Sequence, residues 1–211
     1  MTDQNAIPVQ KRPRARKRRF YEIGPNFALG GGPGFWVEDE SVLPPYGVPR
    51  LPASTAQVPF VFDKSVGQPP CDIELCFGWW LVSERTKALF ERLDPEAFVF
   101  VPCEVRTPRG RYDGPKFWLC DVVRVLDALD EAQSRLRIGI RDDIRFLDHG
   151  QKYYEFLTFG GKLDFREAAI GNARIFRMAY MDLTYICDQE FKDACKSAGL
   201  RKIRFRDVLK I

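Results

Sequence analysis

The clearest pattern of apolar and polar positions follows Trp80 and predicts an amphipathic helix over Glu84–Leu93. Ser83 precedes this helix and suits an N-cap, because a serine hydroxyl can accept a hydrogen bond from an unpaired backbone N–H of the first turn. Pro95 follows the helix, and a residue before proline disfavours the helical conformation. Apolar side chains three and four residues apart share one helix face, and here they are Leu89, Phe90 and Leu93.

A second helix is predicted near the end of the chain, over residues 189–198. Asp188 is placed to accept from its first turn, and Gly199 stands where a left-handed C-terminal cap is favoured. Its apolar face carries Phe191, Ala194 and Cys195. Both helices therefore have one face suited to packing against a sheet.

Short apolar or alternating runs predict strands beside these helices and between them. Along residues 135–140 the apolar positions fall on one face, because successive side chains of a strand point to opposite sides. The predicted strands cover residues 79–82, 98–101, 117–126, 135–140, 174–178, 183–187 and 203–205. Strands interrupted by two clear helices predict an α+β fold, with a mainly antiparallel sheet and two or three packed helices.

The two helical regions resemble each other at an offset of 105 residues. Ser83 aligns with Asp188, and Lys87 aligns with Lys192. Both regions read as a strand, a capped helix and a second strand. An internal duplication would explain this likeness, and so would the general similarity of capped amphipathic helices. Both alternatives predict two similar helices packed on a sheet.

The first 70 residues differ in composition from the rest of the chain. Residues 1–19 are predicted to be a flexible basic arm, since like charges repel one another and few apolar side chains are available to bury. Residues 20–70 are rich in proline and glycine and predict short strands and turns packed on a body formed by 71–211. We therefore expect a single α+β domain over 20–211.

The net charge of +4 belongs to the arm. Seven side chains between residues 11 and 19 are basic, whereas the chain beyond residue 19 has 26 basic and 28 acidic side chains. Such an arm can contact nucleic acid, a membrane surface or an acidic protein, or it can be a solvated tail. Because the body shows no concentration of basic residues, a nucleic-acid partner is the secondary hypothesis.

Membrane insertion and cofactor binding find no support in the sequence. No apolar run approaches the roughly 20 residues needed to span a bilayer, and no apolar signal-peptide segment follows the basic start. The six cysteines form no C-x-x-C pair, which disfavours zinc and predicts reduced, mostly buried thiols. We expect a cytoplasmic protein without a cofactor or a metal.

Candidate catalytic groups are few. His149 is the single histidine and lies in a turn-like setting, and no serine stands in a nucleophile elbow. Two carboxylate pairs could in principle hold Mg²⁺, namely Asp121 with Asp127 and Asp142 with Asp143. No lysine or histidine accompanies them at nuclease-like spacing, so they are interpreted as solvated acids or as acids facing a basic partner. We expect no enzymatic activity.

Trp79 and Trp80 are adjacent in a predicted strand, so their rings point to opposite sides. One ring is expected in the core. The other ring either packs against a second layer or contacts a partner, since tryptophan is enriched in binding hot spots.

Motifs spread between Gly78 and Phe205 resemble, in order, those of one bacterial family. The matching segments are 78–85 (its Trp-x-x-Ser-Glu motif), 100–105 (the strand after the helix), 125–130 (an Asp-containing stretch), 175–177 (a Phe-Arg strand) and 188–205 (the terminal helix and strand). The chain resembles immunity protein family eleven of bacterial polymorphic toxin systems, long known only as a domain of unknown function. The resemblance covers residues 70–208. Residues 201–203 stand where a Thr-Gly-like turn is expected.

This resemblance implies a protein that binds a cognate secreted antibacterial toxin and blocks its active site or its folding, without catalysis. Its motifs are mainly structural and do not identify the contact surface. Acids would steer the encounter with a basic toxin that attacks nucleic acid. The toxin-contact candidates are Asp142, Asp143, Asp148, Trp79 and Trp80. The alternative is a nucleic-acid-associated protein that uses the arm.

Overall fold

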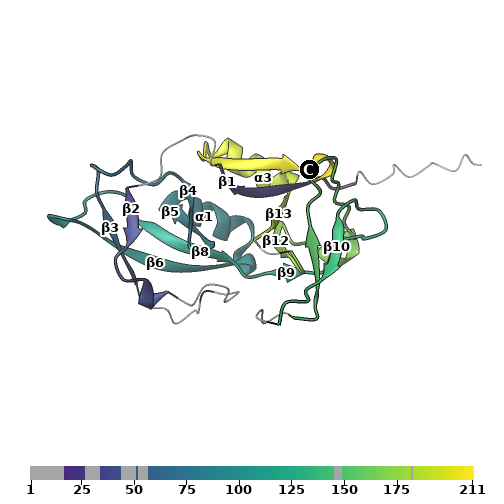
Figure 1. Cartoon of the computed structure of the whole chain (residues 1–211). Helices are drawn as coiled ribbons and strands as arrows, with labels where there is room; N and C mark the ends of the chain where they lie inside the picture. Colours follow the sequence, from purple (N-terminus) through teal and green to yellow (C-terminus); the bar gives the residue numbers. More distant parts are fainter. Residues whose placement is uncertain (1–16, 27–33, 44–50, 52–56, 145–148, 182) are drawn as a thin grey trace, which may run out of the picture.

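Figure 1 shows the computed structural model of the chain, which is elongated and has a β-sheet in each half. The structure describes residues 17–26, 34–43, 51, 57–144, 149–181 and 183–211. Within this part, three α-helices and fourteen strands form an α+β fold whose strand pairs are mostly antiparallel. The predicted fold class is therefore confirmed.

The larger sheet has the strand order β2-β3-β6-β8-β5-β4, and β7 pairs with the end of β6. Among these described strands β3 and β6 run parallel, and the other neighbours are antiparallel. The helix α1 (Glu84–Leu93) connects β5 to β6. The strands are β2 (Phe35–Val37), β3 (Val58–Phe62), β4 (Ile73–Cys76), β5 (Trp79–Ser83), β6 (Phe98–Thr107), β7 (Gly110–Arg111) and β8 (Phe117–Val122).

The smaller sheet has the order β14-β1-β13-β12-β9, in which β9 joins β12 in parallel and the other pairs are antiparallel. A separate ribbon of two antiparallel strands, β10 and β11, lies beside it. The helix α3 (Gln189–Ser197) connects β13 to β14, and α2 (Glu167–Ile170) is a single turn. The strands are β1 (Phe20–Pro25), β9 (Val125–Leu126), β10 (Arg137–Ile140), β11 (Lys152–Glu155), β12 (Ile175–Met178), β13 (Tyr185–Asp188) and β14 (Ile203–Asp207).

Both predicted helices are present, and their caps are the predicted residues. The backbone N–H of Thr86 donates to the Ser83 hydroxyl (3.4 Å), and the N–H of Phe191 donates to the Asp188 carboxylate (2.8 Å). α1 has the predicted bounds, and α3 ends at Ser197, one residue earlier than predicted. The capping signals in the sequence therefore located both helix starts correctly.

The internal likeness of the two helical regions extends to the topology of the sheets. In the first unit, the β4–β5 hairpin leads through α1 to β6, and β8 is inserted between β5 and β6. In the second unit, the β12–β13 pair leads through α3 to β14, and β1 is inserted between β13 and β14. The strand registers match as well: Ser83 with Phe117 and Asp188 with Phe20, then Phe100 with Cys120 and Phe205 with Ile23. This agreement supports an internal duplication.

Residues at equivalent positions of the two units contact each other. The rings of Trp80 and Tyr185, which are 105 residues apart, have centroids separated by 4.6 Å. A Cβ placed on Gly78 would lie 3.9 Å from the side chain of its equivalent, Leu183. Contact between equivalent positions is the pattern that a local two-fold relationship produces. The β4–β5 turn and the β12–β13 loop therefore meet where the two units join.

The large buried cluster at this join contains residues of both sheets and both long helices. Phe90 of α1 and Phe191 of α3 are fully buried in it, with ring centroids 5.1 Å apart. Trp80 belongs to this cluster, whereas Trp79 belongs to a second cluster on the opposite face of β5. The alternation of a strand therefore places the two indoles in two different cores.

The end of the predicted basic arm contacts the folded body. Each of its last three residues binds a different acid: Lys17 with Asp164 (2.5 Å), Arg18 with Asp188 (2.9 Å) and Arg19 with Asp207 (2.9 Å). Arg18 also donates to two backbone carbonyls beside α2, each at 2.8 Å. Residues 1–16, the rest of the predicted arm, lie outside the described residues.

The proline- and glycine-rich region 20–70 contributes strands to both sheets. β1 is an inner strand of the smaller sheet, while β2 and β3 form one side of the larger sheet. The described part of this region thus supplies structural strands rather than a separate layer. No helix among the described residues combines the length and the apolar character that crossing a membrane requires.

Candidate functional site

The two tryptophans proposed as toxin contacts are buried. Trp79 is 6% exposed and Trp80 is 1% exposed. Of the two alternatives open from the sequence, packing in the core is what the structure shows for both rings. Their contribution to a contact surface is therefore to support the β4–β5 turn that precedes them.

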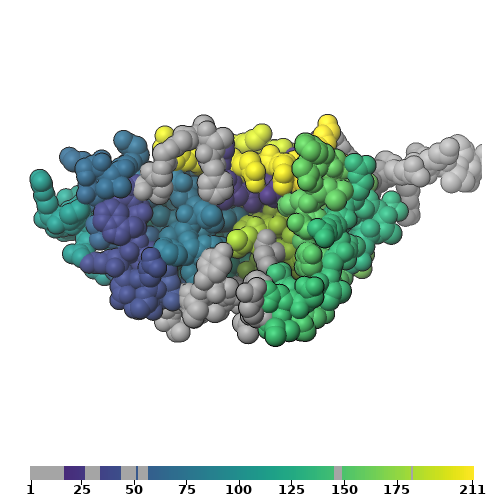
Figure 2. All heavy atoms as spheres, in the orientation of Figure 1, coloured from purple at the N-terminus to yellow at the C-terminus, as the bar shows by residue number. Residues whose placement is uncertain are grey.

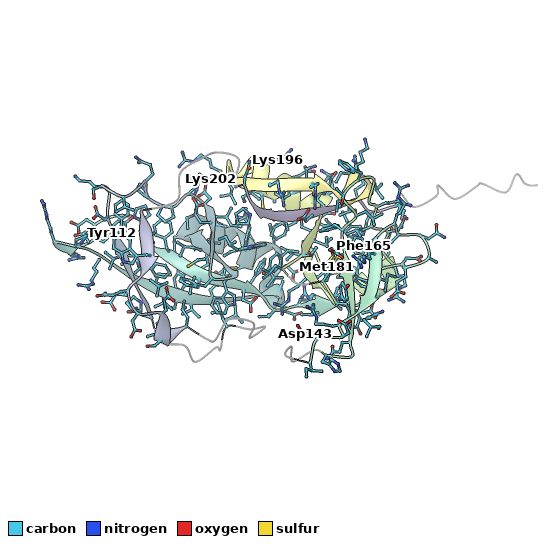
Figure 3. All side chains as sticks on the ribbon, viewed as in Figure 1. Tyr112, Asp143, Phe165, Met181, Lys196 and Lys202 are labelled. Atoms are coloured by element: carbon cyan, nitrogen blue, oxygen red, sulfur yellow. The ribbon has the colours of Figure 1, made fainter. Side chains whose placement is uncertain are left out.

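The acids proposed as toxin contacts follow β10 directly. Asp142 is exposed and has no salt-bridge partner among the described residues, and Asp143 is half-buried with contacts of its own. Figure 3 shows Asp143 at the end of the β10–β11 ribbon. Asp148 lies outside the described residues. A role in toxin contact stays a prediction for all three acids.

The residues weighed for catalysis are engaged in other ways or stand apart. His149 is exposed in a turn. Asp121 is buried and accepts a hydrogen bond from the backbone N–H of Leu51 (3.1 Å), while Asp127 is exposed and contacts Arg166 (3.4 Å). The structure therefore gives each acid of this pair its own structural contacts.

All six cysteines are free thiols, three of them buried and three half-buried. Burial raises the pKa of the Cys76 and Cys195 thiols to about 12. Burial also holds the pKa of Cys187 well above its ordinary value. Because the thiolate is the reactive form, these three side chains behave as small apolar groups.

Exposed apolar side chains gather where the two units meet. We call this set the junction strip, and it consists of Phe77 (43% exposed), Ile138 (46%), Ile140 (61%), Tyr180 (39%) and Leu183 (50%). Scattered apolar residues are normal on a protein surface, but a connected group of them marks an interaction site. Whether these five form one surface depends on the contacts between their elements.

Contacts between neighbouring elements connect the strip from the β4–β5 turn to the ribbon. Leu183 lies against Gly78, the neighbour of Phe77 in the β4–β5 turn. Tyr180 belongs to the same β12–β13 loop as Leu183, and its carbonyl accepts from the backbone N–H of Tyr154 in β11 (2.6 Å). Leu183 therefore contacts the turn on one side, and Tyr180 contacts the ribbon on the other.

The ribbon continues the strip on the same face. Ile138 pairs with Tyr154, and Ile140 pairs with Lys152, and directly opposed residues of two strands share a face. The Lys152 ammonium lies 4.5 Å from the centre of the Tyr180 ring. Ile138 and Ile140 therefore extend the surface that begins at Phe77.

The face drawn in Figure 2 shows yellow-green atoms of the β12–β13 region between the blue β4–β5 region and the green ribbon. In Figure 3, Met181 marks the position of the β12–β13 loop between these elements. Two open hollows, of about 570 and 400 Å³, contain no residue of the strip. The strip is thus an open surface at the join and not the lining of either hollow.

Three residues of the strip have an unusual backbone. Phe77 (φ 51°), Tyr180 (φ 61°) and Leu183 (φ 54°) all occupy the left-handed region, as does Gly78 (φ 88°). A non-glycine residue there is uncommon, and a bulky one is strained. A two-residue hairpin turn with positive φ at both positions ordinarily favours Asn-Gly. The chain thus has a phenylalanine where the backbone favours asparagine.

Sequence reasoning missed this surface, although one signal was available. Phe77-Gly78 directly precedes the predicted strand 79–82, and a glycine in a two-residue connection between strands is a hairpin signal. Phe77, at the other turn position, is 43% exposed. Positive φ at Tyr180 and Leu183 has no comparable sequence signal.

A known protein family matches nearly the whole chain. The profile of the immunity protein family (Imm11) matches residues 19–210, a range that includes every described strand and both repeated units. The match begins at residue 19, earlier than the motifs had indicated, and so includes the strand β1 that completes the second unit. A comparison with curated proteins gave no match. The chain belongs to the immunity protein family (Imm11).

Proposed function

We propose that this protein binds a cognate antibacterial toxin in the cytoplasm of the producing cell and neutralises it by occupancy, without catalysis. The observation that carries the proposal is the family match over residues 19–210. The exposed apolar surface at the join of the two units supports a binding role, because connected apolar side chains on a surface mark contact sites.

Neutralisation by occupancy and neutralisation by catalysis differ in stoichiometry. A protein that acts by binding inhibits in proportion to its amount, so inhibition is complete only near one molecule for each toxin molecule. An enzyme that modifies or degrades the toxin needs far less. We expect titration of the purified toxin domain to reach its end point near equimolar amounts.

The test uses the toxin domain encoded by the neighbouring gene. Co-expression with this chain should restore growth to cells that make the toxin, and the two proteins should elute together from a size-exclusion column. Mass spectrometry of the toxin after incubation should show an unchanged mass. Heat-denatured chain is the control. A toxin that stays active beside an excess of folded chain would contradict the proposal.

The alternative of nucleic-acid binding through the arm gains nothing from the described residues. Lys17, Arg18 and Arg19 are each paired with an acid of the body, so their charges are already compensated. Only electrophoretic shifts that weaken steeply with salt would support that function.

A further inference from the structure

We infer that the junction strip is the surface that contacts the toxin, and that its partner presents an apolar protrusion flanked by a basic side chain. This inference rests on the proposed function and adds to it the location of the interface and the chemistry of the partner. Four observations carry it: exposure, backbone strain, position at the join of the units, and charge.

The strained backbone of Phe77, Tyr180 and Leu183 indicates that the strip has a role other than in folding. Left-handed backbone at bulky residues costs free energy and persists at sites where function requires it. Leu183 takes φ 54° at the position where the equivalent residue of the first unit is Gly78. Glycine adopts this conformation without cost. The second unit therefore has a strained, exposed leucine at the position where the first unit has an unstrained glycine.

The position of the strip favours a rigid contact surface. Its three loop residues come from the β4–β5 turn and the β12–β13 loop. The Tyr185 hydroxyl donates to the Gly78 carbonyl of the turn (3.4 Å), and the backbone N–H of Tyr154 in β11 donates to the Tyr180 carbonyl (2.6 Å). Trp80 follows the β4–β5 turn in sequence, and Tyr185 follows the β12–β13 loop. The buried rings of these two residues contact each other. Aromatic and apolar side chains held in fixed positions make good anchors, because little conformational freedom is lost on binding.

Charge complementarity defines the partner. Asp142 lies two residues beyond Ile140, is exposed, and has no salt-bridge partner in the described part of the chain. The Lys152 ammonium on the same face is already bound to Glu131 (2.6 Å). The uncompensated charge beside the strip is therefore negative, in a body that has two more acidic than basic side chains. A lysine or arginine of the partner fits there.

The test compares the affinity of purified variants for the purified toxin domain encoded by the neighbouring gene. Phe77→Asn and Leu183→Asn remove the exposed side chain and place asparagine, which tolerates left-handed backbone, at each position. We expect the dissociation constant to rise at least thirtyfold, the loss typical of a binding hot spot. The midpoint of urea unfolding should stay the same or rise.

Phe159→Asn is the matched control. Phe159 is 87% exposed and lies in the hollow beside Lys210, which contains no residue of the strip. Its replacement should change the dissociation constant less than threefold. Asp142→Lys should weaken binding and reverse the salt dependence that the wild-type chain shows, because the partner's cation would then face a like charge.

The outcomes separate the two proposals. If the wild-type chain fails to bind the toxin domain, the proposed function is wrong and this inference falls with it. If the wild-type chain binds and neutralises, but Phe77→Asn and Leu183→Asn bind within threefold of it, the function stands and the interface is elsewhere. A lower unfolding midpoint in both variants would show that the strained residues serve the fold, and would also overturn the inference.

Discussion

The rings of Trp80 and Tyr185 lie 4.6 Å apart, although 105 residues separate them in the chain. The two residues hold the same position in two units that share topology and strand register. Each is nearly fully buried, so the contact joins the larger sheet to the smaller one through the common core. The stability of the whole chain should therefore depend on this pair.

Trp80→Ala should lower the free energy of unfolding by about 3–5 kcal/mol, the usual cost of removing a fully buried large aromatic side chain. A double-mutant cycle of Trp80→Phe with Tyr185→Leu should give a coupling energy of about 0.5–1.5 kcal/mol. Urea unfolding followed by circular dichroism measures both. The cycle of Trp79→Phe with Tyr185→Leu is the control, since Trp79 lies on the opposite face of β5. Equal coupling in the two cycles would contradict a specific contact.

The two helix caps should differ in strength. Ser83→Ala removes the weak cap hydrogen bond and the hydrogen bond that the Ser83 hydroxyl donates to Asp72 (2.9 Å), and should cost about 1–2 kcal/mol of unfolding free energy. Asp188→Ala also deprives Arg18 of its carboxylate partner (2.9 Å) and should cost at least about 2 kcal/mol. Asp193→Ala, at an exposed position of α3, is the control and should change the unfolding midpoint little. A larger loss from Ser83→Ala than from Asp188→Ala would refute this ordering.

Helix starts could be read from the sequence because a cap is a local signal. The predicted N-caps at Ser83 and Asp188 are those observed, and the strand before each cap followed from its apolar run. The place of β1 could not be read in this way. Phe20–Pro25 pairs with strands near the other end of the chain, and pairing at that separation leaves no local pattern.

The candidate site was less predictable than the fold, for a similar reason. Trp79 and Trp80 were weighed as contacts because their residue type is frequent in interfaces. Both are buried because β5 is an inner strand covered on both faces. The junction strip depends on tertiary contact between the β4–β5 turn and the β12–β13 loop, and no local pattern records it.

Stability should fall in acid through Asp72. Partial burial opposes ionisation of this side chain, but hydrogen bonds from Arg85, the backbone N–H of Arg201 and Ser83 outweigh it and hold its pKa below the ordinary value. The unfolded chain has an ordinary aspartate pKa near 4. The stabilisation is therefore complete above about pH 4 and is lost as the pH falls through the lower pKa of the folded state.

The measurement compares wild-type chain with Asp72→Asn in urea at pH 6 and at pH 3. The wild-type advantage in unfolding free energy should be large at pH 6 and smaller at pH 3. Asp113→Asn, at a highly exposed acid, is the control and should show little difference at either pH. An advantage that grows in acid would show that the carboxylate of Asp72 is not the stabilising form.

The free protein should tend to associate through β10. Among the described residues this strand pairs only with β11, and Ile138 and Ile140 are exposed on it. Exposed apolar edge strands pair with other chains, and a lysine on the edge prevents this. Ile140→Lys should therefore reduce light scattering of the concentrated chain. Val66→Lys, at another exposed apolar residue, should leave the light scattering unchanged. An equal effect of the two substitutions would indicate that any added positive charge reduces association.

The two parts of the basic segment, residues 1–16 and residues 17–19, should differ in their roles. Deletion of residues 1–16 should leave urea unfolding and protection against the toxin unchanged. Deletion of residues 1–19 also removes the Arg18 contacts to Asp188 and to two carbonyls, and should cost about 1–3 kcal/mol of unfolding free energy. Unfolding measurements and growth assays test both truncations. Loss of protection with the shorter deletion would assign the arm a role in binding.

The inner position of β1 has a consequence for biosynthesis. Glu22 of β1 binds Arg206 of β14, 184 positions later, and β1 lies between β13 and β14 in the sheet. The ribosome makes β1 before every other described strand, and its two neighbours, β13 and β14, are the last of these strands to be made. A chain released before β13 leaves β1 without its neighbours and the first unit without its half of the shared core. Under the proposed function, protection would therefore begin only after translation has reached β14, because the sheet around β1 cannot form earlier.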